Sequence, residues 1–191
     1  MMFRDDPYYI RLVLNGEASA YRGLVEKHQD LVYTIVHRIV TRAEEAEEVA
    51  QDVFVKAYHK LSDFKAEAKF STWLYRIAYN TAVSHTRKKK VEFLAMDEEM
   101  IENHSDDEIQ QEIMGLSKDE QSALIKSALS SLPRTDSLII SLYYYHGKDL
   151  EEISGIVDLS QNNVKVKLFR IRKKLLKEMN NLLDKNINTV A

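Results

Sequence analysis

Amides and cations recur near the end of the chain at the spacing of one helix face, and these residue types suit contacts with DNA. Asparagine can pair with adenine, whereas lysine and arginine pair with guanine or with backbone phosphates. The candidate contact residues are Asn163, Lys165, Val166, Lys167, Arg170 and Lys174. Two interpretations of Val166 stay open, because a valine can touch a thymine methyl group or simply add packing. The pattern predicts a surface that reads the DNA major groove.

The elements that must position this face form an expected helix-turn-helix. Residues 150–156 make a short helical segment, residues 158–160 a turn, and residues 164–177 a longer basic helix. The apolar stripe of that second helix consists of Val164, Leu168, Ile171 and Leu175. Ser160 is its expected N-cap. A unit of this kind places one helix in the major groove.

The composition sets limits on the class of protein. The chain has 191 residues, 45% of them hydrophobic, so it can bury the core of one or two domains. It has no cysteine, which excludes disulfides, thiolate zinc sites and thiol nucleophiles. No apolar run approaches the roughly 20 residues that span a bilayer, and the first residues lack a signal-peptide core. We therefore expect a cytoplasmic protein.

Charge is unevenly distributed along the chain. The formal charge is +3 over residues 1–91, −10 over residues 92–120 and +4 over residues 121–191. These segments predict two mildly basic modules and an acidic linker between them. The linker has two open interpretations, a solvated spacer or a segment that imitates nucleic acid inside a basic channel.

Helical periodicity predicts three helices in the first module. One follows the turn Asn15-Gly16 and runs from Tyr21 to Ile39. The second begins near Glu44 and has an expected core face of Ala46, Val49, Ala50, Val53, Ala57 and Tyr58. The third spans residues 71–87 and ends in the basic run 87–90.

Helical segments also dominate the second module. A helix is expected over residues 121–132, and Pro133 is the expected first residue of the next. The core face of that next helix is Leu138, Ile139, Leu142 and Tyr143. The pair His146-Gly147 is a stop signal. Because no strand-like alternation is present, the predicted fold class is all-α, in two helical modules.

Two elements of the first module are more specific than the helix-turn-helix. Residues 48–54 read Glu-Val-Ala-Gln-Asp-Val-Phe, and residues 71–80 read Ser-Thr-Trp-Leu-Tyr-Arg-Ile-Ala-Tyr-Asn. On these motifs the chain resembles sigma factors of the extracytoplasmic-function (ECF) type, the compact branch of the sigma-70 family, from about Tyr21 to Lys177. The resemblance implies sigma region 2 in residues 1–91, sigma region 4 in residues 121–191, and a role in promoter-specific transcription initiation.

For the first module, the resemblance implies a contact with the beta-prime clamp of core RNA polymerase. Its residues would be Glu48, Gln51 and Asp52, whose carboxylates and amide can meet arginines of a partner. The alternative is an ordinary acidic solvent face. The beta flap of the polymerase is the corresponding partner implied for the second module.

The resemblance also implies that the first module opens the minus-ten promoter element and captures a flipped base. An aromatic wall and hydrogen-bonding groups suit an extruded base, and cations suit the opened backbone. The candidate residues are Phe64, Lys65, Lys69, Arg76, Asn80, Arg87 and Lys88. Alternatives remain open here: Phe64 can be a hydrophobic staple, Trp73 a core residue, and the basic run a solvated helix end.

The second module would read the minus-thirty-five element. Its recognition helix departs from the family's usual Pro-x-Gly-Thr-Val-Lys-Ser-Arg opening, because Asn162, Asn163 and Val166 stand at atypical positions. The base preference therefore stays open. The resemblance further suggests an anti-sigma factor as partner and places the linker in the RNA-exit channel of the polymerase.

No enzymatic role is expected. The sequence has no P-loop, nucleophile elbow or glycine-rich dinucleotide turn. Glu44, Glu48 and Asp52 share a helix face, but no second set of metal ligands is evident. We predict neither a metal nor a cofactor. Two alternative classes are a stand-alone helix-turn-helix regulator, which would bind a palindromic site without polymerase, and a protein-interaction module.

Overall fold

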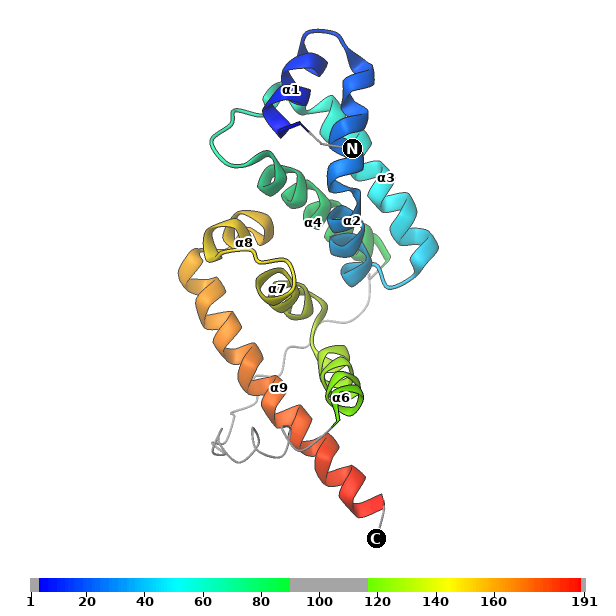
Figure 1. Cartoon of the computed structure of the whole chain (residues 1–191), viewed down its shortest axis with the longest axis vertical. Helices are drawn as coiled ribbons and strands as arrows, with labels where there is room; N and C mark the ends of the chain where they lie inside the picture. Colours follow the sequence, from blue (N-terminus) through cyan, green and yellow to red (C-terminus); the bar gives the residue numbers. More distant parts are fainter. Residues whose placement is uncertain (1–3, 90–116, 190–191) are drawn as a thin grey trace.

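The computed structural model describes residues 4–89 and 117–189, and within these ranges the regular structure is helical, without strands (Figure 1). The all-α prediction is confirmed. The first module contains α1 (Asp6–Leu14), η1 (Ala18–Ala20), α2 (Tyr21–Ile39), α3 (Ala43–His59), η2 (Leu61–Asp63) and α4 (Phe70–Lys89). The second contains α6 (Lys118–Ser131), α7 (Arg134–Tyr144), α8 (Leu150–Val157) and α9 (Gln161–Thr189). None of these helices is long and apolar enough to cross a bilayer.

The periodicity of the sequence placed α2, α3 and α4 within a few residues of their observed bounds, but it did not reveal α1. The signals for α1 are local, since the Asp5 side chain accepts a hydrogen bond from the Tyr8 amide and Pro7 lies in the first turn. After α1 the expected turn is present, with Gly16 at φ 99°.

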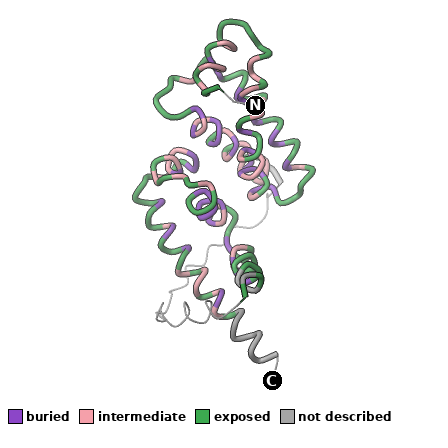
Figure 2. Tube along the Cα trace, viewed as in Figure 1, coloured by how far each residue is buried: buried purple, intermediate pink, exposed green. Residues whose placement is uncertain are grey.

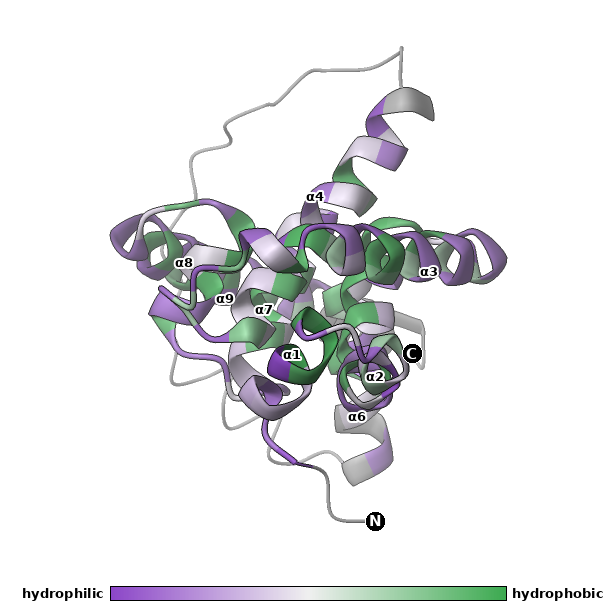
Figure 3. Cartoon of the chain, turned by 90° about the horizontal axis from the view of Figure 1, so that it is seen from above, coloured by the Kyte–Doolittle hydropathy of each residue, from purple (hydrophilic) through white to green (hydrophobic). Residues whose placement is uncertain are grey.

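The core of the first module lies between α2, α3 and α4 (Figures 2 and 3). The buried residues of α2 are Leu24, His28, Val32, Ile35, Val36 and Ile39. Small residues on α3, such as Ala46 and Ala57, are fully buried and allow close approach of the helices. The expectation of a buried Tyr58 was wrong, because this residue is 40% exposed and its ring packs edge-on against Tyr21 at the start of α2.

Helix α7 lies in the middle of the molecule and contacts α2, α8 and α9 (Figure 1). Its consecutive residues from Leu138 to Leu142 are all buried, as expected for a helix surrounded on several sides. Tyr143 was expected on the core face and is instead 40% exposed. The helix begins at Arg134, so Pro133 is its N-cap rather than its first residue. A positive φ at Gly147 marks the predicted stop.

The core is continuous across both modules. One hydrophobic cluster includes Leu24 and Leu74 of the first module together with Leu138, Ile153 and Ile171 of the second. A smaller cluster joins α6 to α9 through the side chains of Leu124, Ala128 and Met179. The two charge-defined modules are therefore packed against one another.

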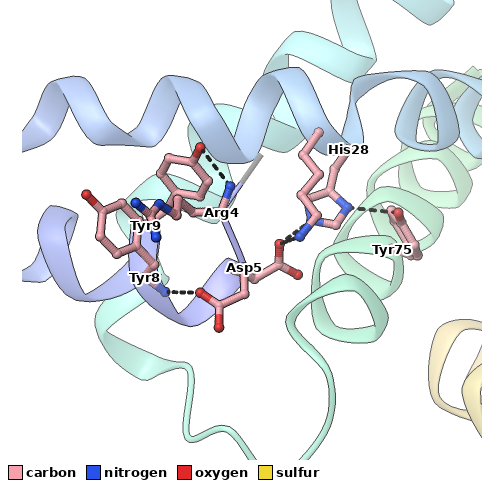
Figure 4. Close-up of polar contacts among 8 residues, drawn as sticks. Arg4, Asp5, Tyr8, Tyr9, His28 and Tyr75 are labelled. Atoms are coloured by element: carbon pink, nitrogen blue, oxygen red, sulfur yellow. Dashed lines mark hydrogen bonds and ion pairs between the residues drawn. The ribbon is translucent and has the colours of Figure 1, made fainter. Parts of the chain in front are cut away.

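A buried polar network ties α1 to α2 and α4 (Figure 4). Asp6 accepts from the Lys27 ammonium at 2.6 Å and lies 3.1 Å from His28 Nε2, while His28 Nδ1 lies 2.9 Å from the Tyr75 hydroxyl. Burial by itself raises the pKa of Asp6, but the hydrogen bonds and charges of His28 and Lys27 hold it below its usual value. Burial, followed by the charges of Asp6 and Glu152, raises the pKa of Tyr75 to about 12.

Replacing Asp6 tests the attachment of α1. Asp6→Asn removes a charge-assisted partner of Lys27 and His28, so the free energy of unfolding should fall by about 1–2 kcal/mol at neutral pH. Because the folded-state pKa of Asp6 is lowered, its stabilisation is present above the usual pKa of aspartate and is lost as the pH falls through the lowered value. The difference between wild type and variant should therefore shrink in acid.

Urea denaturation at a series of pH values measures this difference. Asp30→Asn is the matched control, because Asp30 is an exposed carboxylate on the neighbouring α2. A difference between Asp6→Asn and wild type that grew in acid would contradict the assignment.

Candidate nucleic-acid interfaces

The expected helix-turn-helix is present, and local hydrogen bonds fix its turn. At the start of α8, the Asp149 carboxylate accepts from the Glu152 amide at 2.8 Å, as part of a capping box. Asp158 ends α8 in the left-handed conformation, with φ 58°. The Ser160 hydroxyl then accepts from the Asn163 amide at 3.2 Å, which confirms it as the cap of α9.

Helix α9 separates an apolar stripe from a polar face. Val164, Leu168 and Ile171 are buried and Leu175 is partly buried, as their spacing predicts. The candidate contact residues that are exposed are Asn163, Lys165, Val166, Arg170 and Lys174. This arrangement leaves an amide and three cations of one rigid helix available to DNA.

Lys167 differs from the other candidates on α9. Its ammonium donates a hydrogen bond to the Asp136 carboxylate of α7, and Asp136 is buried. The pair neutralises Lys167 and anchors α9 to α7. Its partner lies in another helix 31 residues earlier, so the helical pattern of α9 gave no sign of the pairing.

Phe169 is a surface residue that sequence reasoning missed. The residue is 54% exposed, next to Arg170, and the Lys173 ammonium lies 5.2 Å from the ring centroid. Val166, three residues earlier, is also exposed. The sequence signal for this surface was a pair of apolar residues, three positions apart, that lie off the buried stripe and beside cations. Packing in the core does not explain why these two positions are apolar.

The outer face of α3 carries the acidic candidates. Glu48, Gln51 and Asp52 are all exposed, and Val55 continues the same face at 56% exposure. Among the described residues, no group of three or more His, Asp or Glu side chains is placed to hold a metal ion. This face is thus a rigid, exposed array of hydrogen-bond acceptors suited to a cationic partner.

The loop before α4 and the first turns of that helix hold an aromatic cluster. The Phe64 ring centroid lies 5.6 Å from that of Phe70 and 5.4 Å from that of Trp73, and all three pack on the core. Phe64 and Trp73 are both half-buried. Within the loop Ala66 has φ 58°, a conformation that costs a non-glycine residue energy. The cluster therefore holds Phe64 beside a strained loop.

The remaining minus-ten candidates fall into two groups. Lys65, Asn80 and Arg87 are exposed. Lys88 lies within α4, but its side chain is outside the described part of the structure.

Lys69 and Arg76 are already paired with the second module. Lys69 donates to Glu152 of α8 at 3.1 Å, and Arg76 donates to Asp158 at the end of α8 at 2.7 Å. Burial by itself raises the pKa of Glu152, but the hydrogen bond from Lys69 and the charge of Lys148 lower it below its usual value. Two cations assigned to the minus-ten element thus meet carboxylates of the helix-turn-helix.

Family models match both modules. The family described as Sigma-70 region 2 matches residues 24–91, and the family described as Sigma-70, region 4 matches residues 122–175. The first match contains α3, the aromatic cluster and α4, and the second contains the helix-turn-helix.

Curated proteins resemble the chain over most of its length. It is 31% identical to the RNA polymerase sigma-H factor of Pseudomonas aeruginosa, over 94% of this chain and 96% of that protein. It is also 31% identical to the ECF RNA polymerase sigma factor SigW of Bacillus subtilis, over 91% of this chain and 96% of that protein.

A solved structure shares the fold. The sigma factor RpoE of Bartonella quintana, solved in complex with the anti-sigma factor NepR, superposes with a TM-score of 0.60 at 19% identity. The match covers 84% of this chain and 96% of that one. A stand-alone helix-turn-helix regulator is not favoured, because both sigma regions are matched in one chain. The chain belongs to the sigma-70 family, in its extracytoplasmic-function branch, and is an RNA polymerase sigma factor that directs transcription initiation.

Proposed function

We propose that the two modules divide promoter recognition between them, with all chemistry left to the polymerase. Residues 1–91 bind core RNA polymerase and open the minus-ten element, residues 92–120 connect the modules, and residues 121–191 bind the minus-thirty-five element. The observation that carries this division is the exposed amide and cation face of α9, whose opposite face is buried in the second module. The chain is proposed to have no catalytic activity of its own and to work in the cytoplasm.

The polymerase contact is assigned to the outer face of α3. Glu48, Gln51 and Asp52 are exposed on a helix whose inner face is anchored by Val49 and Val53, so they can meet arginines of the beta-prime clamp without rearrangement. The second module is proposed to contact the beta flap.

The minus-ten contact is assigned to the loop before α4 and to the exposed polar residues of α4. Phe64 lies beside a strained loop and can supply an aromatic wall, while Asn80 offers an amide. The proposed backbone contacts are Lys65, Lys69, Arg76, Arg87 and Lys88.

The minus-thirty-five contact is assigned to Asn163, Lys165, Val166, Arg170 and Lys174 of α9. Lys167 was a further candidate, and we assign it an anchoring role because its ammonium donates a hydrogen bond to Asp136. Phe169 joins the reading face as an apolar group suited to thymine methyls.

Two further contacts belong to this proposal. An anti-sigma factor is proposed because such a protein binds the similarly folded RpoE of Bartonella quintana. The acidic linker is proposed to lie in the RNA-exit channel. Its candidate residues Asp97, Glu98, Glu99, Asp106, Asp107 and Glu108 lie outside the described residues.

Run-off transcription tests the function as a whole. Purified core RNA polymerase is given a pool of genomic promoter fragments with and without the chain. We expect discrete start sites only when the chain is present. The absence of chain-dependent transcripts, together with the absence of association with core polymerase, would overturn the proposal.

Asp52 tests the polymerase contact. Asp52→Ala should weaken binding to core polymerase by about tenfold, because an interfacial arginine loses its carboxylate. Fluorescence anisotropy with labelled chain measures the Kd, and circular dichroism should be unchanged because Asp52 is exposed. Asp30→Ala removes an exposed carboxylate from α2 and should bind normally. Equal loss in both variants would point to a general charge effect.

Arg170 tests the DNA contact. Arg170→Ala should reduce holoenzyme binding to the minus-thirty-five element by roughly 5- to 100-fold, as expected for one lost base or phosphate contact, with core polymerase affinity unchanged. Lys126→Ala removes an exposed cation from α6 of the same module and serves as control. The reverse pattern, with weaker polymerase binding and normal DNA binding, would mean that the roles of the modules are exchanged.

A further inference from the structure

A cavity of about 770 Å³ opens between α2, α6 and α7. Arg38 lines it from the last turn of α2, and Ser137 lines it from the first turn of α7. This volume falls within the range of about 300–1,000 Å³ that small-molecule sites occupy. None of the residues assigned above to polymerase or to promoter DNA lines the cavity.

One face of α6 forms a wall of the cavity. Ser122, Lys126 and Ser130 follow one another at the four-residue spacing of a single row on a helix, and Ile125 and Leu129 form the next row. The first row offers hydroxyl groups and a cation, and the second offers aliphatic surface. The wall thus places a polar strip beside an apolar one.

The cavity carries two cations without a carboxylate. Arg38 and Lys126 line it, whereas no aspartate or glutamate is among its described lining residues. Lys69, Arg76 and Lys167 each meet a carboxylate of another helix or its cap. Within the described residues, neither Arg38 nor Lys126 forms such an ion pair. The positive charge of the cavity is therefore left uncompensated.

The Arg38 guanidinium is anchored but not fully partnered. Its Nη1 atom donates to the Ser137 hydroxyl at 2.9 Å, while its Nε atom is buried without a hydrogen-bond partner. Burial lowers the pKa of Arg38, and Tyr145 acts in the opposite direction. A cation that is partly removed from water gains from an anion that binds beside it.

His146 lies in the same positive field. Burial, followed by the charges of Arg38 and Lys148, lowers the pKa of this imidazole. The neutral form of the histidine is thus favoured, so His146 adds no positive charge that would replace a missing anion. The local charges favour a negatively charged ligand at the end of α2.

An exposed aromatic ring faces the solvent at the rim. Tyr145, which follows α7, is 63% exposed, and Ile125 of α6 is 38% exposed. Aliphatic and aromatic surfaces of this kind can pack against the face of a flat ring. The site therefore combines groups suited to an anion with groups suited to an apolar or aromatic body.

We propose that this cavity binds a small molecule that joins a phosphomonoester to a ring, the chemical class of a nucleoside monophosphate. Arg38 and Lys126 pair with the phosphate, and the serine hydroxyls donate to its remaining oxygens. The ring lies against Ile125, Leu129 and Tyr145. Two cations match the charge of about −1.5 to −2 that a phosphomonoester carries at neutral pH.

A nucleic-acid strand fits this cavity less well. A protein that tracks a phosphate backbone needs cations spread over many phosphates. The described lining of this cavity instead holds two cations in a recess formed by three helices. A small ligand can use both at once with a single phosphate.

Isothermal titration calorimetry of the full chain tests the proposal with three kinds of probe. The four ribonucleoside monophosphates carry phosphate and ring, inorganic phosphate carries the anion alone, and the four nucleosides carry the ring alone. At least one monophosphate should bind with a Kd below about 1 mM, and both of its parts at least about tenfold more weakly. If none of the four binds, the site is wrong. Equal binding of inorganic phosphate would show an ion site without ring recognition and would also overturn the proposal.

Variants of the two cations locate the binding site. Arg38→Gln should weaken binding of the monophosphate by at least about tenfold, and Arg38→Lys, which keeps the charge, should weaken it less. Because Arg38→Gln also loses the hydrogen bond to Ser137, Lys126→Gln is the second test. Lys126 is exposed, so this variant should keep the fold and bind roughly threefold or more weakly.

Arg22→Gln is the matched control. It removes a cation from α2, the helix of Arg38, at a side chain that is 83% exposed and outside the cavity. Its affinity for the monophosphate should equal that of wild type. Unchanged affinity in Lys126→Gln, or an equal loss in Arg22→Gln, would overturn the site. These titrations use the free chain without polymerase or promoter DNA, so their outcome is independent of the proposed function.

Discussion

The burial of α7 on several sides is the constraint on which the rest of the structure depends. An amphipathic helix usually buries one stripe, but the consecutive residues Leu138 to Leu142 are all buried. Within its own module α7 meets α8 and α9, and across the module boundary it meets α2. If the modules separated, the apolar surface of α7 that faces α2 would be exposed to water unless a partner covered it. This packing makes one hydrophobic cluster out of two charge-defined modules.

The position of α8 follows from that of α7. Because α8 is joined to α7 by a short connection and packs on α4, its acidic residues come to lie over cations of the first module. Surface ion pairs of this kind contribute little to stability, so the packing of the apolar faces decides which faces meet. In this molecule that packing brings two of the minus-ten candidates against the helix-turn-helix and leaves the outer face of α3 exposed.

Buried charged or titratable side chains in this molecule have partners on other helices. Asp136 is buried in α7 and is matched by Lys167 from α9, and His28 is buried in α2 and is matched by Asp6 and Tyr75. A buried carboxylate or imidazole without a partner would cost considerable free energy. Each pair joins different helices, so each also fixes how those helices are oriented. Among the described residues, the Arg38 Nε atom and the Ser141 hydroxyl, near the contact between modules, are buried without a hydrogen-bond partner.

The sequence by itself determined the features that depend on local spacing. Periodicity predicted α2, α3, α4 and the helix-turn-helix, Ser160 was recognised as a cap, and the motifs at residues 48–54 and 71–80 indicated the family. Helix α1 was missed because it has only 9 residues and its signals, the cap Asp5 and Pro7 in the first turn, are local. Tyr58 and Tyr143 were wrongly predicted to lie on buried faces, because the width of the buried face of a helix depends on which helices surround it.

Only the tertiary structure decided which candidate residues are free. Lys69 and Glu152 are separated by 83 residues, Arg76 and Asp158 by 82, and Lys167 and Asp136 by 31. Hydrophobic periodicity and capping rules act over a few residues, so they identify a cation on a helix face but not the carboxylate that another helix brings to it. That choice depends on how the apolar faces of distant helices pack, because their packing places the charged rims opposite one another.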